Sequence, residues 1–109
     1  METGQARTAA VILAAGSGTR MGSNIRKQYM QLAGKPVLFY SLKALEESKA
    51  DEIVLVVSAN DVDYCRSEIV EKFGFQKVRH IVEGGKERYH SVALGLESVS
   101  DCDYVLIHD

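Results

Sequence analysis

The sequence predicts a doubly wound α/β fold built on a mostly parallel sheet. Short apolar, β-branched runs alternate along the chain with segments whose apolar residues recur every three or four positions. One of these runs, EIVLVVS at 52–58, is apolar almost throughout, which is typical of a parallel strand covered on both faces. Glycine-rich or acidic residues follow three of the runs, at the position where such sheets bind ligands.

The predicted strands and helices alternate from one end of the chain to the other. Four segments are predicted strands: 8–14, 52–58, 78–82 and 103–108. The helices between them are 37–47, a segment that begins after Asp61, and 88–99. Pro36 suits the start of the first helix, and Asp61 can cap the second. The residues expected on the inner helix faces are Leu38, Leu42 and Leu45, then Val62, Cys65, Ile69 and Phe73, then Val92, Leu96 and Val99.

Composition and charge describe one small globular domain of 109 residues, 46% hydrophobic, with a formal net charge of −2. This charge provides no basic field for nucleic acid, and no apolar run reaches the roughly 20 residues that span a bilayer. The start, METGQART, lacks the apolar core of a secretory signal, and Cys65 and Cys102 form neither a metal motif nor a disulfide framework. We therefore expect a cytoplasmic protein without nucleic-acid or membrane partners, with a tail at 1–7 and a domain at 8–109.

The most informative segment is the loop AAGSGTRMG at 14–22, which follows the first predicted strand. Small residues let backbone N–H groups approach phosphate oxygens, and Arg20 and Lys27 add the positive charge that a polyphosphate needs. The loop lacks the Gly-Lys-Ser/Thr ending of a Walker A motif. It also departs from the dinucleotide fingerprint, because its third glycine arrives one residue late at Gly22. The segment predicts a nucleoside triphosphate site; the alternative is a purely structural turn.

Two further places can carry chemistry. The pair Gly84-Gly85 follows the third predicted strand, and Ser91 falls in the first turn of the next helix. This block can read a base or ribose, or it can be a glycine turn before a solvated helix start. Asp109 ends the last strand, where a carboxylate can help to hold magnesium with phosphate oxygens and water, or can simply form a turn.

These residues together resemble the cytidylyltransferase family that acts on 2-C-methyl-D-erythritol 4-phosphate in isoprenoid synthesis. The resemblance covers residues 10–109. AAGSGTRMG is shared with many sugar-nucleotide pyrophosphorylases, whereas Lys27-Gln28-Tyr29 and the segment LAGKP at 32–36 narrow the match. The block GGKERYHSVALGL at 84–96 and the final His108-Asp109 are the most specific elements.

The resemblance implies a Rossmann-like nucleotidyltransferase fold and a role for individual residues. It implies that Arg20 and Lys27 are catalytic cations that neutralise the triphosphate and the transition state. Four residues are implied in the nucleotide cradle, namely Ala14, Ala15, Gly16 and Gly18, while Gly85 and Ser91 are implied as cytosine contacts. Asp109 is implied as the Mg²⁺ ligand. Lys86 departs from the acidic residue of some relatives, which puts a contact from that side chain in doubt.

The implied reaction moves CMP from CTP to 2-C-methyl-D-erythritol 4-phosphate and releases pyrophosphate. Relatives continue well beyond His-Asp, so we expect residues 8–109 to be the N-terminal half of a single domain, with an incomplete fold and little or no activity alone. The full-length form is expected to be a homodimer. Three alternatives stay open: a ribitol-5-phosphate cytidylyltransferase, a sugar-1-phosphate uridylyltransferase or molybdopterin nucleotidyltransferase, and a nucleotide-binding module without turnover.

Overall fold

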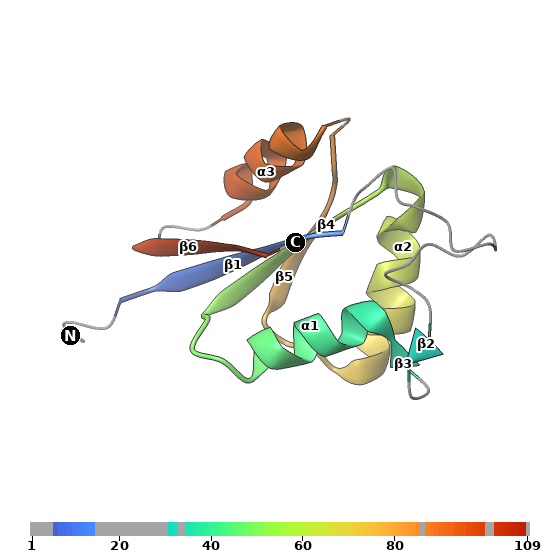
Figure 1. The fold of residues 1–109 in the computed structure, drawn as a ribbon. Coiled ribbons are helices and arrows are strands. Elements are labelled where there is room, and N and C mark those ends of the chain that lie inside the picture. Colours follow the sequence, from blue (N-terminus) through green and yellow to red (C-terminus); the bar gives the residue numbers. More distant parts are fainter. Residues whose placement is uncertain (1–5, 15–30, 33–34, 86, 100–101, 109) are drawn as a thin grey trace.

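A four-stranded parallel sheet forms the centre of the computed structural model (Figure 1). The structure describes residues 6–14, 31–32, 35–85, 87–99 and 102–108. The strands are β1 (Thr8–Leu13), β4 (Glu52–Val57), β5 (Val78–Glu83) and β6 (Tyr104–His108). Their order in the sheet is β5-β4-β1-β6, and every neighbouring pair is parallel. The predicted sheet is therefore confirmed, and the order of the strands reverses between β1 and β6.

Helices cover both faces of this sheet, as a doubly wound fold requires (Figure 1). One face carries α1 (Val37–Glu46) and a helical segment made of η2 (Ala59–Asp61), α2 (Val62–Cys65) and the π-helical η3 (Arg66–Glu71). The other face carries α3 (Arg88–Glu97). The helices fall where the apolar periodicity predicts them.

Alternate residues of β1 and β4 supply two separate apolar clusters, because successive side chains of a strand point to opposite faces. The larger cluster lies under α1 and α2 and includes Ile12 and Leu55 from the sheet, with Leu42 and Ile69 from the helices. The smaller cluster lies under α3 and is formed by Val11, Val54 and Val56. All six residues of β4 are buried, which confirms that this strand is covered on both faces.

One local expectation is wrong, and one pair of strands was not expected. Asp61 precedes α2, but its side chain makes no capping hydrogen bond. The reason is that a 3₁₀ turn comes first, so Asp61 has helical angles (φ −105°, ψ −4°) instead of the extended ones of an N-cap. A two-stranded antiparallel hairpin, β2 (Gln31–Leu32) with β3 (Lys35–Pro36), was not expected, since two-residue strands leave no periodicity to detect.

The inner face of α3 agrees with the prediction only in part, since Val99, just after the helix, packs against the smaller cluster. Leu96 is 43% exposed, whereas the buried residues of the helix are Ser91 and Gly95. A Cβ atom at Gly95 would lie 2.6 Å from Val11 Cγ1, closer than real Cβ contacts come. The helix thus packs so near the sheet that only small residues fit beneath it.

The amino ends of the strands are joined by carboxylates. The N–H of Thr8 donates to Asp51 Oδ2 at 2.8 Å, and that of Arg7 donates to Asp103 Oδ2 at 2.9 Å. The Arg7 guanidinium in turn donates to the buried carboxylate of Glu52, with Nη2 2.8 Å from Oε1. These contacts tie the strands together at the rim opposite the predicted site.

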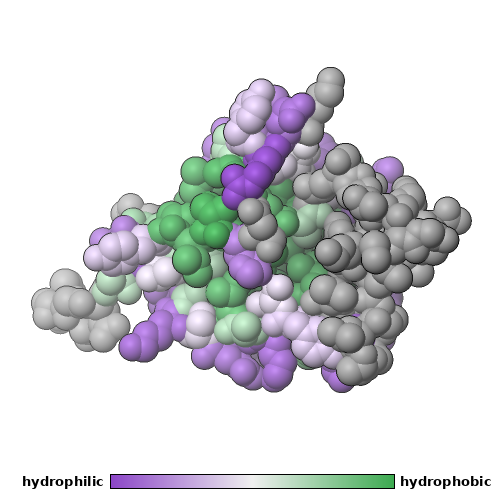
Figure 2. Space-filling view, in the orientation of Figure 1, coloured by the Kyte–Doolittle hydropathy of each residue, from purple (hydrophilic) through white to green (hydrophobic). Residues whose placement is uncertain are grey.

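The edge strand β6 is the most exposed part of the sheet. Tyr104 is 64% exposed, Leu106 52% and Val105 39%. Figure 2 shows apolar side chains on the surface where β6 and α3 lie. None of the described helices is long and apolar enough to cross a membrane.

Candidate nucleotide site

The two loops singled out by sequence leave the same rim of the sheet, from the two strands that flank β4. The N–H of Ala14, one residue after β1, donates to Val56 O at 2.8 Å. The N–H of Gly84, one residue after β5, donates to Val57 O at 2.7 Å. Consecutive carbonyls of one buried strand therefore hold the start of both loops, and the carboxyl rim brings Ala14 and the glycine pair together as predicted.

Several predicted site residues lie outside the described part of the chain. They are Ala15, Gly16, Gly18, Arg20, Lys27 and Asp109. Lys86, which departs from the acidic residue of some relatives, also lies outside the described residues. The structure gives the points from which their segments start: Ala14 for the glycine-rich loop, and His108 at the end of β6 for Asp109. Because His108 pairs in register with Ile12 of β1, both starting points are at the same end of the sheet.

Gly85 and Ser91 are joined directly. The N–H of Gly85 donates to Ser91 Oγ, 3.1 Å away, and Ser91 is only 2% exposed. A Cβ atom at Gly85 would lie 2.3 Å from His90 Cβ, so no side chain fits at this position unless α3 moves. The need for glycine here therefore comes from close packing against the first turn of α3.

His90 is a residue of the site that the sequence reasoning missed. Its Nδ1 lies 3.4 Å from the N–H of Glu87, the residue at the N-cap of α3, and its ring packs on that of Tyr89 with centroids 4.3 Å apart. Glu87 and His90 occupy the N-cap and N3 positions of α3, but Glu-x-x-His differs from the Ser/Thr-x-x-Glu/Gln signature of a capping box, so the sequence carried no signal for His90.

The end of β6 is fixed by a contact across the molecule. Nε2 of His108 lies 3.3 Å from Ser41 Oγ of α1. This contact links the last described residue of the edge strand to the helix that covers the sheet. Among the described residues, no group of three or more His, Cys, Asp and Glu is placed to hold a metal ion.

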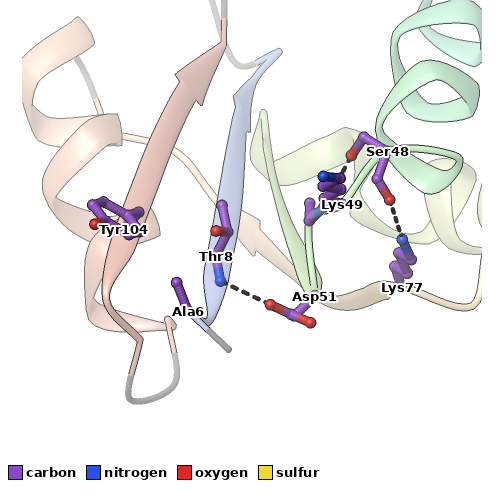
Figure 3. Close-up of a pocket in the computed structure, with 8 residues that line it drawn as sticks. Ala6, Thr8, Ser48, Lys49, Asp51, Lys77 and Tyr104 are labelled. Atoms are coloured by element: carbon purple, nitrogen blue, oxygen red, sulfur yellow. Dashed lines mark hydrogen bonds between the residues drawn. The ribbon is translucent and has the colours of Figure 1, made fainter. Parts of the chain in front are cut away.

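A hollow of about 650 Å³ lies elsewhere, at the amino ends of the strands (Figure 3). Its polar groups are largely bonded to one another: Lys77 Nζ donates to Ser48 O at 2.8 Å, and Asp51 accepts the Thr8 N–H. Ligands of doubly wound sheets bind at the carboxyl ends instead. We therefore place the candidate site at Ala14, the glycine pair and Ser91, and not in this hollow.

Comparison with known proteins shows which family this chain resembles. The family model described as 2-C-methyl-D-erythritol 4-phosphate cytidylyltransferase matches residues 8–109. A protein of that name from Lachnoclostridium phytofermentans is 52% identical over 103 residues, which are 94% of this chain and 44% of the relative. Another, from Lachnospira eligens, is 55% identical over 101 residues, covering 92% and 44%. The chain thus spans a little under half the length of these relatives.

Solved structures show the same likeness. The crystal structure of 4-diphosphocytidyl-2C-methyl-D-erythritol synthase from Anaerococcus prevotii matches with a TM-score of 0.75 and 32% identity, over 95% of this chain and 43% of that one. The inositol-1-phosphate CTP transferase from T. maritima has a TM-score of 0.73 over 94% of this chain and 44% of its own, but at 22% identity it shows a shared fold alone. With the family model matching almost its whole length, the chain belongs to the 2-C-methyl-D-erythritol 4-phosphate cytidylyltransferase family.

Proposed function

We propose that this chain forms the nucleotide-binding half of an enzyme that transfers CMP from CTP to 2-C-methyl-D-erythritol 4-phosphate and releases pyrophosphate. The observation that carries the proposal is the pair of hydrogen bonds from Ala14 and Gly84 to the consecutive residues Val56 and Val57. They bring the glycine-rich loop expected to bind phosphates beside the block expected to read the base. One nucleotide can then contact both.

The reaction requires positioning and charge neutralisation more than a covalent nucleophile. An oxygen of the acceptor phosphate forms a bond to the α-phosphorus of CTP, while the bond from that phosphorus to the β-phosphate oxygen breaks. Pyrophosphate leaves with the electron pair. Arg20 and Lys27 are the proposed cations that lower the repulsion between the two anions and stabilise the transition state. Ala15, Gly16 and Gly18 are proposed to contribute backbone groups to the phosphates.

Magnesium is the proposed cofactor, with Asp109 as its protein ligand. A lone carboxylate fits this ion, because Mg²⁺ is usually bound through one or two carboxylates together with substrate phosphates and water. When bound, the ion would neutralise charge on the triphosphate.

The remaining parts of the proposal concern the whole protein. We propose a cytoplasmic location and a homodimer, which the resemblance to the family supports. The presence of two cysteines without a disulfide framework also favours a reducing compartment.

The nucleotide is tested in a chimera in which residues 8–109 replace the matching segment of the Lachnoclostridium phytofermentans relative. We expect Mg²⁺-dependent pyrophosphate release with CTP and methylerythritol phosphate, and little with UTP. The isolated 109-residue chain is assayed beside it and is expected to turn over slowly or not at all. A folded chimera that releases pyrophosphate equally well from UTP would overturn the assignment of the nucleotide.

The acceptor needs a separate test, since the chimera takes its second half from the relative. The full-length gene product is assayed with CTP and either methylerythritol phosphate or ribitol 5-phosphate. Turnover with methylerythritol phosphate alone supports the proposal. Turnover with ribitol 5-phosphate alone would leave the proposed nucleotide unchanged and would show that the proposed acceptor is wrong.

A further inference from the structure

Both N–H groups of the glycine pair after β5 are already used within the protein. Gly84 donates to Val57 O at 2.7 Å, and Gly85 donates to Ser91 Oγ at 3.1 Å. A cradle for phosphate needs N–H groups that are free to donate. The N–H groups of this pair are therefore not available to a phosphate in the free chain, and the side chain of Ser91 is the group that fixes its second residue.

The position of Ser91 depends on how α3 packs. Ser91 and Gly95 are one helical turn apart and are the two buried residues of this helix. Because Gly95 has no side chain, the helix lies against Val11 and Val56, and its first turn meets the loop. From that position the Ser91 hydroxyl accepts the Gly85 N–H, while His90 closes the space next to Gly85.

We infer that Ser91 is a positioning residue, which acts on the nucleotide through Gly85 instead of serving only as a contact to the base. Its hydroxyl oxygen fixes the orientation of the peptide before Gly85 and so determines which backbone groups of the loop face the ligand. The consequence for the nucleotide rests on the proposed function. The hydrogen bond itself exists in the free chain and is testable there.

The test is amide hydrogen exchange, followed by NMR on the ¹⁵N-labelled 109-residue chain without nucleotide. In Ser91→Ala the Gly85 amide should exchange about threefold to tenfold faster, the change that losing one net hydrogen bond produces. In Ser91→Cys, whose thiol is somewhat larger than the hydroxyl and a weaker acceptor, the Gly85 amide should exchange at a rate between those of the wild type and Ser91→Ala. Ser67→Ala is the matched control, because the exposed Ser67 hydroxyl donates to Asp63 O at 3.0 Å, within its own helical segment.

Exchange of the Gly85 amide at the wild-type rate in a folded Ser91→Ala chain would overturn the inference. If that variant fails to fold, the Ser91→Cys chain decides in the same way. This readout needs no catalysis, so it stands even if the proposed function is wrong.

The second readout uses the chimera. If Ser91 positions a loop that reads the base and takes no part in the chemical step, Ser91→Ala in the chimera should raise the KM for CTP about threefold to tenfold. The kcat of this variant should change less than twofold. The KM for the acceptor should not change. A fall in kcat with the KM for CTP unchanged would show that Ser91 does not act through nucleotide binding.

Discussion

Gly95→Ala sets two opposing effects against each other, and the structure decides which is larger. In a helix interior, alanine is favoured over glycine by about 1 kcal/mol. At this position the new Cβ would lie 2.6 Å from Val11 Cγ1 and 3.1 Å from Val56 Cγ2. The first distance is about 0.8 Å short of the 3.4 Å at which ordinary contact begins, so α3 or the sheet must move. Overpacking of this kind costs about 1–3 kcal/mol. We expect a net destabilisation of about 1 kcal/mol.

The assay is thermal and urea unfolding of the 109-residue chain, followed by circular dichroism. A loss of about 1 kcal/mol corresponds to a melting temperature about 4–8 °C lower in a domain of this size. A double-mutant cycle with Val11→Ala isolates the cause, because that change removes the Cγ1 atom and should reduce the cost of Gly95→Ala. A higher melting temperature for Gly95→Ala, or an equal cost in both backgrounds, would refute the reasoning.

Four further predictions concern other parts of the chain. Arg7→Met should lower the free energy of unfolding by about 1–3 kcal/mol, because it removes the guanidinium from the buried Glu52 carboxylate. Urea unfolding measures this loss, with Lys43→Met as the control, since that change breaks an exposed pair with Glu47. A loss no larger than that of the control would contradict the prediction. Gly74→Ala should lower the free energy of unfolding by about 1 kcal/mol through the φ of +71° alone, since no atom lies within 4 Å of the added Cβ. Gly74→Asn should lower it less in the same urea unfolding experiment, because asparagine adopts the left-handed conformation more readily than alanine. Burial, together with Cys65, Glu68 and Asp61, raises the pKa of Tyr64 above 10.0, so the folded state favours the neutral phenol. Stability should therefore fall as the pH rises above 10, and Tyr64→Phe should make this fall smaller in urea unfolding at pH 10 and above. In the chimera, Arg20→Ala or Lys27→Ala should each lower kcat by a factor of about 10²–10³. Arg79→Ala, which changes an exposed arginine of β5, is the control and should leave kcat unchanged. A loss of kcat under threefold in both Arg20→Ala and Lys27→Ala would exclude these cations from catalysis.

Apolar periodicity correctly predicts the buried face of a helix whose large apolar side chains separate it from the sheet. The leucines of α1 show this, since Leu38 and Leu42 are buried and Leu45 packs against the same cluster. The same signal is right only in part on α3, because Val99 packs against the smaller cluster whereas Leu96 is 43% exposed. A helix that approaches the sheet closely is marked by small residues, and a hydrophobicity pattern gives no weight to glycine or serine.

For the candidate site, the sequence correctly indicated the rim of the sheet from which the loops start. Glycine-rich segments after strands correctly indicate which rim of the sheet carries the loops, because parallel strands end at one edge. The role of Val56 and Val57 could not be predicted, since it depends on backbone carbonyls and not on the identity of their side chains. The contact between His90 and Gly85 depends on where α3 begins, and sequence gives helix ends only to within a few residues.

The hydrogen bonds from Ala14 and Gly84 to neighbouring residues of β4 also set a length scale. One loop starts from the strand on one side of β4 and the other from the strand on the opposite side, so the starting points are two inter-strand spacings apart, or about 10 Å. That separation is a property of the peptide backbone, and no side-chain substitution in the sheet alters it appreciably. A change in the size of the ligand must then be accommodated by the loops, whose length and composition can vary while the distance between their origins stays constant.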